Sequence, residues 1–150
     1  ISDGMMPIGD ATLGPQRPPA LRFEEARDEV QALLVSCLLN GAQCALKSSE
    51  WRAAETRASK ALQLDAKNAK ALFRRGTARV KSGDYADARD DLRRACALEP
   101  KAKEIREMFE ECKMAAAAEK EAQRAFYANT KAASGGYEAP PEVKEELFVC

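Results

Sequence analysis

Two stretches of the chain repeat each other at a spacing of 34 residues. Shifting the chain by this amount lays residues 38–67 on residues 72–101 without a gap. Identical residues then meet at several positions, which include Leu38 with Leu72, Ala54 with Ala88, Ala61 with Ala95 and Leu64 with Leu98. Repeats of this length indicate an array of similar units that stack on one another, because a single unit cannot bury its own apolar face.

Apolar residues inside and around the repeat recur at helical spacing. We expect five helices, over residues 21–47, 50–64, 69–81, 86–98 and 101–133, separated by the turn segments SSEW, DAKN, SGDY and Glu99-Pro100. Small residues at equivalent positions, Ala42 and Gly76, would allow the helices of each pair to approach closely. The chain is therefore divided into a Pro/Gly-rich lead-in (1–20), a hairpin (21–65), a second hairpin (67–100), a capping helix (101–133) and a polar tail (134–150).

The apolar face of the two long helices is assigned from the same periodicity. For the first helix it predicts burial of Leu21, Ala26, Val30, Leu33, Leu34, Cys37, Leu38, Ala42 and Cys44. For the last helix it predicts burial of Ile105, Met108, Phe109, Cys112, Ala116, Ala122 and Phe126.

Charge and composition argue against several classes of function. Lys and Arg (24) balance Asp and Glu (24), locally as well as in total, as in RDDLRR, which disfavours binding to nucleic acid or to a membrane surface. No apolar run reaches the length of roughly 18 residues that a membrane span needs. The chain has no His and shows no nucleophile–base pair or Gly-rich phosphate loop, so we expect neither catalysis nor a cofactor.

The five cysteines, Cys37, Cys44, Cys96, Cys112 and Cys150, form no C-x-x-C pair. Without a His companion they favour neither a zinc site nor a disulfide framework. We expect them to be small apolar core residues in a reducing compartment, which favours a cytoplasmic location. The interior of an organelle is the alternative if a targeting peptide has been removed.

The stretch KALFRRG (70–76) places several cations within one predicted helix. Helical periodicity puts Leu72, Phe73 and Gly76 on the packed face, and Lys70, Arg74, Thr77 and Lys81 together on another face. One repeat earlier the same positions hold Ser36, Asn40, Gln43 and Lys47. We predict that the two rows lie side by side in a groove rich in hydrogen-bond donors and nearly free of acids. A cationic row that is merely solvated is the alternative.

The period of 34, the small-residue positions, the aromatic residue at the turn (Trp51, Tyr85) and the closing LEP resemble the tetratricopeptide repeat family. The resemblance covers residues 36–100 and implies an all-α fold, in which helical hairpins stack as a short right-handed solenoid ending in a long C-terminal capping helix. Because such arrays commonly hold about three repeats, we expect an upstream repeat to be missing or to have been replaced.

A finer resemblance concerns the predicted groove. LLNGAQC (38–44) and KALFRRG (70–76) are similar to stretches of co-chaperone repeats that carry a dicarboxylate clamp, which grips the acidic tail of heat-shock chaperones ending in Glu-Glu-Val-Asp. The resemblance implies that Asn40, Lys70 and Arg74 contact such a tail. Arg75 has no such role, and we expect it either to cap the packing or to pair with an acid outside the groove. The clamp of the family also uses a Lys and an Asn from the first helix of the first repeat, and residues 1–20 contain no such helix and no Lys. Either that repeat lies before Ile1 or the clamp is a relic, and within this chain the clamp is partial.

The segment KMAAAAEKEAQRAFYANTKAA (113–133) resembles the charged helix that follows the repeats of large immunophilins, which are peptidyl-prolyl isomerases. Three functions therefore stay open. The chain is a co-chaperone-like domain that binds an acidic peptide, a structural subunit docked on a larger assembly, or the non-catalytic part of an isomerase whose active domain is absent. In each case the expected partner is a protein, not nucleic acid or a membrane.

Overall fold

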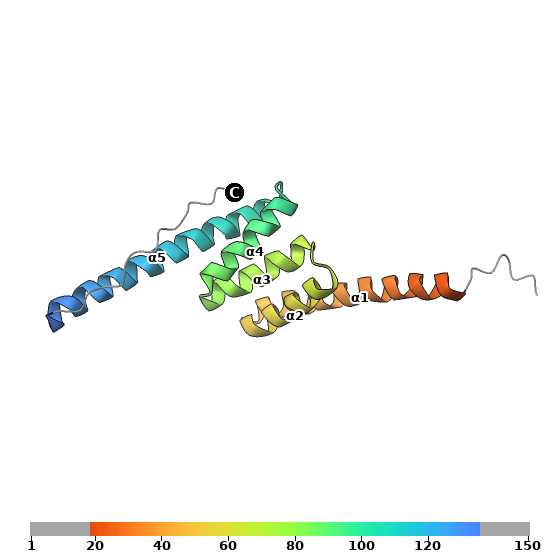
Figure 1. Cartoon of the computed structure of the whole chain (residues 1–150), viewed down its shortest axis with the longest axis horizontal. Coiled ribbons are helices and arrows are strands. Elements are labelled where there is room, and N and C mark those ends of the chain that lie inside the picture. The colour runs from red at the N-terminus through yellow and green to blue at the C-terminus, as the bar shows by residue number, and fades with distance from the viewer. Residues whose placement is uncertain (1–18, 136–150) are drawn as a thin grey trace, which may run out of the picture. The chain divides into compact units, whose positions relative to one another are not determined.

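The computed structural model describes residues 19–135 and shows five α-helices there, with no strand (Figure 1). They are α1 (Pro19–Lys47), α2 (Trp51–Leu64), α3 (Ala69–Ser82), α4 (Tyr85–Leu98) and α5 (Lys103–Ser134). Every helix boundary lies within two residues of the predicted one. Most of the expected lead-in and tail lies outside the described residues.

The chain divides into two compact units, Ile1–Leu33 and Leu34–Cys150, with the boundary inside α1. In the first unit the described side chains of α1, residues 22–33, are all exposed. The predicted burial of Ala26, Val30 and Leu33 is therefore wrong, and the side chain of Leu21 lies outside the described residues. In this unit the structure shows no neighbouring element that covers the apolar positions.

In the second unit the buried face of α1 consists of Val35, Leu39, Ala42 and Ala45. The prediction is correct for Ala42, and Leu38 is half-buried. It is wrong for Leu34, Cys37 and Cys44, which are exposed. The apolar residues of α1 form two adjacent rows, and only the row that faces α2 and α3 is covered. Periodicity alone does not tell which of two apolar rows finds a neighbour.

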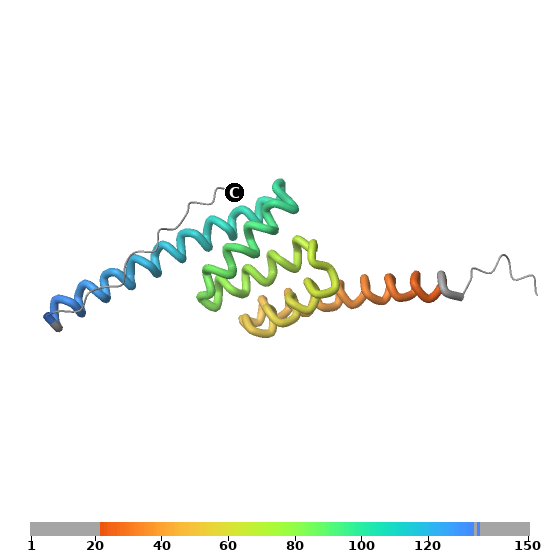
Figure 2. Tube along the Cα trace, in the orientation of Figure 1, coloured from red at the N-terminus to blue at the C-terminus, as the bar shows by residue number. Residues whose placement is uncertain are grey.

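The helices of the second unit stack in sequence order, with α3 packed against α2, α4 and α5. The chain reverses at each short connection, as the trace from α2 to α5 shows (Figure 2). One apolar cluster joins α3, α4 and α5 through Leu72, Leu92 and Phe109. Another joins α1, α2 and α3 through Leu39, Ala61 and Ala71. Because α3 contacts elements on both sides, its rotation decides which of its side chains reach solvent.

Close approach of α3 and α4 depends on a glycine. A Cβ placed on Gly76 would lie 2.8 Å from Cγ of Leu92 and 3.5 Å from the carbonyl oxygen of Ala88. A side chain at this position would push the two helices apart, since real Cβ atoms do not approach so closely. The predicted role of this small residue is confirmed.

The turn between α3 and α4 uses a left-handed backbone conformation at Gly83, with a φ of 93°. At the other end of α3, the Asn68 side chain accepts a hydrogen bond from the backbone N–H of Ala71 (3.0 Å) and caps the helix. These two end signals fix α3 between Ala69 and Ser82.

The last helix packs on α4 only in its first half. Ile105, Phe109 and Cys112 are buried there, whereas Ala122 and Phe126 are exposed, so the prediction of a packed face as far as Phe126 is wrong. No element of the described chain covers this second half of α5. The helical pattern continues beyond the region where a neighbour is present.

By length and composition alone, the segment Arg22–Lys47 of α1 would be able to cross a membrane, so the expectation that no segment reaches this threshold fails. In the second unit, however, apolar residues of this segment pack into the helical clusters, with Val35 and Leu39 buried in one and Ala45 in another. Packing in the repeat therefore accounts for these residues.

Candidate functional site

The side chains of α3 separate into four directions. Leu72 and Gly76 are buried toward α4, whereas Ala71 and Ala78 are buried in clusters shared with α1 and α2. Arg75 and Arg79 bridge to α2 and α4. The remaining direction, at about 100° per residue, carries Lys70, Arg74, Thr77 and Lys81. With Asn40 and Gln43 of α1, we call these six residues the donor face.

Packing between α1 and α3 sets the register of the two rows. Leu39 clusters with Ala71, and Ala45 clusters with Ala78, so the helices run alongside each other at a nearly constant offset. That the two predicted rows lie side by side in one groove stays a prediction.

Asn40 and Lys70 are exposed, while Gln43, Arg74 and Thr77 are half-buried. In the part of the chain that the structure describes, Asn40, Lys70 and Arg74 make no hydrogen bond or ion pair through their side chains. Partial burial lowers the pKa of the Arg74 guanidinium, and no carboxylate opposes that effect. Arg74 therefore holds a partly desolvated positive charge whose pairing capacity is unused.

The neighbouring arginines of α3 are paired with acids. Arg75 donates to both carboxylate oxygens of Asp91 (2.6 and 2.8 Å), and Arg79 donates to Asp91 and to Glu55 (2.8 Å each). Only 4% of the Asp91 side chain is exposed. Of the two roles expected for Arg75, pairing with an acid away from the donor face is the one that the structure shows.

The charge environment of Arg79 is the reverse of that of Arg74. Burial by itself would lower the pKa of Arg79, but the hydrogen bond to Glu55 and the charges of Asp91, Glu55 and Asp87 together raise it. Two arginines of one helix, five residues apart, thus differ in whether an acid stabilises their charge. Of these two arginines, Arg74 is the one without an acid among the described residues, so it is able to pair with an external anion.

Two members of the donor face already have partners. The Thr77 hydroxyl donates to the carbonyl oxygen of Phe73 in its own helix (2.8 Å), and the Lys81 ammonium pairs with Glu111 of α5 (2.9 Å). The prediction of a groove nearly free of acids is therefore wrong at the Lys81 end. Nothing in the repeat pattern signalled Glu111, because it lies beyond the second repeat.

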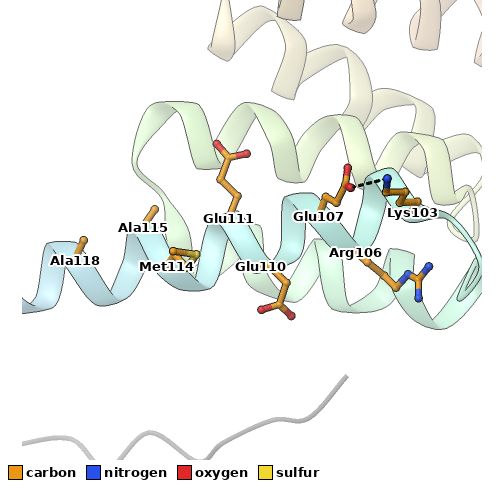
Figure 3. Close-up of a pocket in the computed structure, with 8 residues that line it drawn as sticks. All are labelled: Lys103, Arg106, Glu107, Glu110, Glu111, Met114, Ala115 and Ala118. Carbon is orange, nitrogen blue, oxygen red and sulfur yellow. Dashed lines mark ion pairs between the residues drawn. The ribbon is translucent and has the colours of Figure 1, made fainter.

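A strip of α5 lies next to this contact. Its residues are Lys103, Arg106, Glu107, Glu110, Glu111, Met114, Ala115 and Ala118 (Figure 3). All eight belong to one helix, and a single helix encloses no cavity. Lys103 and Glu107 form an ion pair along the strip (3.4 Å). We therefore interpret it as a charged surface with a small apolar end at Met114.

The cysteines divide into two exposed and two buried residues. Cys37 and Cys44 are exposed, which corrects the expectation that they lie in the core, whereas Cys96 and Cys112 are buried. Burial raises the pKa of the Cys112 thiol. Cys150 lies outside the described residues. Among the residues that the structure describes, no group of three His, Cys, Asp or Glu side chains is placed to hold a metal ion.

Comparison with known proteins gives a match to a family sequence profile and similarities to solved structures. The sequence profile of the tetratricopeptide repeat family matches residues 69–102. The C-terminal repeat domain of a putative FK506-binding protein from Plasmodium falciparum matches 73% of this chain and 68% of its own, at 31% identity and a TM-score of 0.59. The repeat domain of Arabidopsis OM64 matches 53% of this chain and 66% of its own, at 34% identity and a TM-score of 0.51.

Curated relatives include the peptidyl-prolyl cis-trans isomerase FKBP4 of cattle and of humans. Each aligns with this chain over 136 positions at 33% identity, and the alignment covers 82% of the chain. The matched part amounts to 30% of the bovine protein and 29% of the human one. The chain therefore spans about a third of the length of the curated relatives that it matches.

Proposed function

Because this chain belongs to the tetratricopeptide repeat family and resembles the repeat domains of immunophilins, we propose that it is a co-chaperone-like interaction domain that binds an acidic C-terminal peptide of a heat-shock chaperone. The peptide's carboxylates would contact Asn40, Lys70 and Arg74 on the donor face. A cytoplasmic location, where such chaperones are found, belongs to the same proposal.

The observation that carries this proposal is the contrast between the cations of α3. Arg75 and Arg79 are neutralised by Asp91 and Glu55, whereas Lys70 and Arg74 face outward without an acid in the described chain. An arginine offers a planar set of donors that suits a carboxylate, lysine a point charge, and asparagine a neutral donor. This set of side chains is suited to binding a peptide that ends in two closely spaced carboxylates.

The similarities agree with a role in protein binding. The C-terminal repeat domain of the Plasmodium falciparum protein is similar in sequence and fold. A chaperone that binds and folds muscle myosin, UNC-45, matches 73% of this chain and 13% of its own, at 32% identity and a TM-score of 0.58. What UNC-45 binds is a property of that protein. For this chain the similarities favour a protein partner, and the donor face supplies the chemistry that selects an acidic one.

The test is a titration of the 150-residue chain with a fluorescent peptide ending in Glu-Glu-Val-Asp, followed by anisotropy. We expect binding with a dissociation constant of millimolar or better. Lys70→Ala and Arg74→Ala should each weaken it by about 10-fold to 100-fold, the loss of one charge-assisted hydrogen bond. Lys60→Ala, which removes an exposed cation from α2, is the matched control and should leave the affinity within about twofold.

Two outcomes would contradict the proposal. One is the absence of binding to the wild-type chain at millimolar peptide, and the other is equal binding by the Lys70→Ala, Arg74→Ala and Lys60→Ala variants. A peptide with an amidated C-terminus separates recognition of the chain end from attraction to acidic side chains. It should bind more weakly than the free acid.

A structural subunit remains a second candidate, favoured by the exposed apolar residues of α1. Val30, Leu33 and Leu34 are about half or more exposed, which is typical of surfaces that contact another protein. In that case the peptide would not bind. The chain as part of an isomerase is compatible with both candidates, because any isomerase activity would belong to a domain outside this chain.

A further inference from the structure

We infer that Glu111 of α5 acts as an internal competitor for Lys81, and so limits how many acidic residues of a bound peptide the donor face recognises. This inference rests on the proposed function, because it concerns the same face of α3. It adds a residue that determines specificity, from a helix outside the two repeats.

The contact itself is a single ion pair between distant parts of the chain. The Lys81 Nζ lies 2.9 Å from Oε1 of Glu111, and the two residues are 30 positions apart in the sequence. Their side chains are 41% and 50% exposed. An ion pair this exposed contributes little to stability because water and salt screen it. A carboxylate from a peptide is therefore able to replace Glu111 at small cost.

Glu111 differs from Asp91, which also pairs with cations of α3, in the exposure of its side chain. Asp91, with 4% of its side chain exposed, lies between Arg75 and Arg79, and removing it would leave the half-buried Arg75 without an acid. Glu111 has no such constraint. Of the acids that contact α3 in the described chain, it is the one that reaches a residue of the donor face.

Position along α3 decides which part of a peptide Lys81 would contact. Lys81 follows Arg74 by seven residues, about 10 Å along the helix axis. This distance corresponds to about three residues of an extended peptide. A carboxylate held at Arg74 is therefore out of reach of Lys81, which would bind a second acidic residue some positions away. While Glu111 occupies Lys81, this second contact is weakened.

The adjacent residue of α5 supplies a matched control. Glu110 also pairs with a lysine, Lys113 (2.7 Å), and these side chains are 63% and 40% exposed. The Glu110 and Glu111 side chains leave the helix in different directions, and only Glu111 points toward the ribbon of α3 (Figure 3). Glu110→Gln and Glu111→Gln therefore remove the same charge and one exposed ion pair each, but only the second frees Lys81.

The experiment titrates the 150-residue chain and its variants with the peptide ending in Glu-Glu-Val-Asp. Glu111→Gln should tighten binding by about twofold to fivefold, the range of an exposed ion pair, while Glu110→Gln should change it by less than about 1.5-fold. In a Lys81→Ala background, Glu111→Gln should have no effect. With a peptide ending in Gln-Gln-Val-Asp, which lacks the second acid, the gain from Glu111→Gln should vanish.

Each alternative result overturns the inference. Equal gains for Glu110→Gln and Glu111→Gln would show a general effect of charge on the approach of the peptide. A gain that persists without Lys81, or with the Gln-Gln-Val-Asp peptide, would show that Lys81 does not make the second contact. Both cases leave the proposed function standing if Lys70→Ala and Arg74→Ala still weaken binding. Failure of the wild-type chain to bind would overturn both.

Discussion

The two hairpins of this chain repeat at a spacing of 34 residues, but they differ in the polar contact that joins their two helices. The shift places Gly41 on Arg75 and Arg57 on Asp91. In the second hairpin, Arg75 of the first helix reaches to Asp91 of the second helix. In the first hairpin, Arg57 of the second helix reaches back and donates to the carbonyl oxygen of Gly41 (2.9 Å). The arginine thus comes from the other helix.

The apolar contact between the helices differs as well. Ala42 and Ala58 of the first hairpin correspond to Gly76 and Leu92 of the second, and all four are buried. Two small residues in one hairpin are matched by a smaller and a larger one in the other. The repeat therefore determines the spacing of the helices, whereas side-chain volume and charge are balanced separately within each hairpin.

This difference has a consequence for function. In the second hairpin the ion pairs of Asp91 and Glu55 hold two arginines of α3 away from the donor face. The rotation of α3 is therefore fixed by buried polar contacts as well as by apolar packing. The first hairpin has no equivalent network among its described residues, and its contribution to the donor face, Asn40 and Gln43, is uncharged.

The largest expected effect is that of Asp91→Asn, which tests the buried network. The substitution removes the negative charge that Arg75 and Arg79 share, and leaves Arg75 half-buried without an acid. We expect the free energy of unfolding to fall by about 3 kcal/mol, as is typical when one partner of a buried ion pair is lost. Urea denaturation followed by circular dichroism measures this change.

Asp90→Asn is the matched control for this prediction. Asp90 precedes Asp91 in α4, is exposed, and lies 3.9 Å from Arg93. Its replacement should change the free energy of unfolding by less than about 0.5 kcal/mol. Similar losses for both variants would mean that the buried network does not distinguish the second hairpin from the first.

A second prediction concerns the side-chain volumes at positions 76 and 92, which differ from those at the equivalent positions of the first hairpin. Gly76→Ala gives the second hairpin the alanine that the first has at position 42, but its Cβ would lie 2.8 Å from Cγ of Leu92. We expect a loss of about 1–3 kcal/mol in the free energy of unfolding, the usual cost of overpacking. The measurement is again urea denaturation.

Leu92→Ala tests the physical reason. Alone it should cost about 2–5 kcal/mol, because it leaves a cavity. Combined with Gly76→Ala it recreates the alanine pair of the first hairpin, and the double variant should lose clearly less than the sum of the two single losses. Strict additivity would show that Leu92 is not what excludes a side chain from position 76.

The repeat allowed much of this fold to be predicted, including the ends of all five helices and the outward direction of Lys70 and Arg74. Helix ends follow from local signals such as Asn68 and Gly83, and faces follow from periodicity. The burial of α1 was harder, because it carries two apolar rows and only contact with α2 and α3 selects between them.

Contacts between distant segments were not predictable in the same way. The pair of Lys81 with Glu111 joins a repeat to a helix that follows it, so no internal comparison points to it. Asp91 stands in a run of alternating charges that resembles a solvated surface, and only the packing of α2, α3 and α4 buries it. The sequence shows which residues share a face, whereas partners across helices depend on how the helices stack.

The smallest expected effect lies in the turns of the two hairpins. Ser49 and Gly83 occupy equivalent positions and both have a positive φ, 60° and 93°. The following residues donate equivalent backbone hydrogen bonds, from Glu50 to Ala45 and from Asp84 to Arg79 (2.9 Å each). The two turns therefore have the same form, but only the second has the residue that adopts this conformation without strain.

Exchanging these residues should move stability in opposite directions. Ser49→Gly relieves the left-handed strain but adds freedom to the unfolded chain, and the balance should raise the free energy of unfolding by about 0.5 kcal/mol. Gly83→Ser should lower it by about 1 kcal/mol through backbone strain alone, since no atom lies within 4 Å of a Cβ placed there. Both are measured by urea denaturation. If Ser49→Gly instead lowers the free energy of unfolding, the serine side chain stabilises the first turn by more than its backbone strain costs. The two turns would then differ in energy although they share one backbone form.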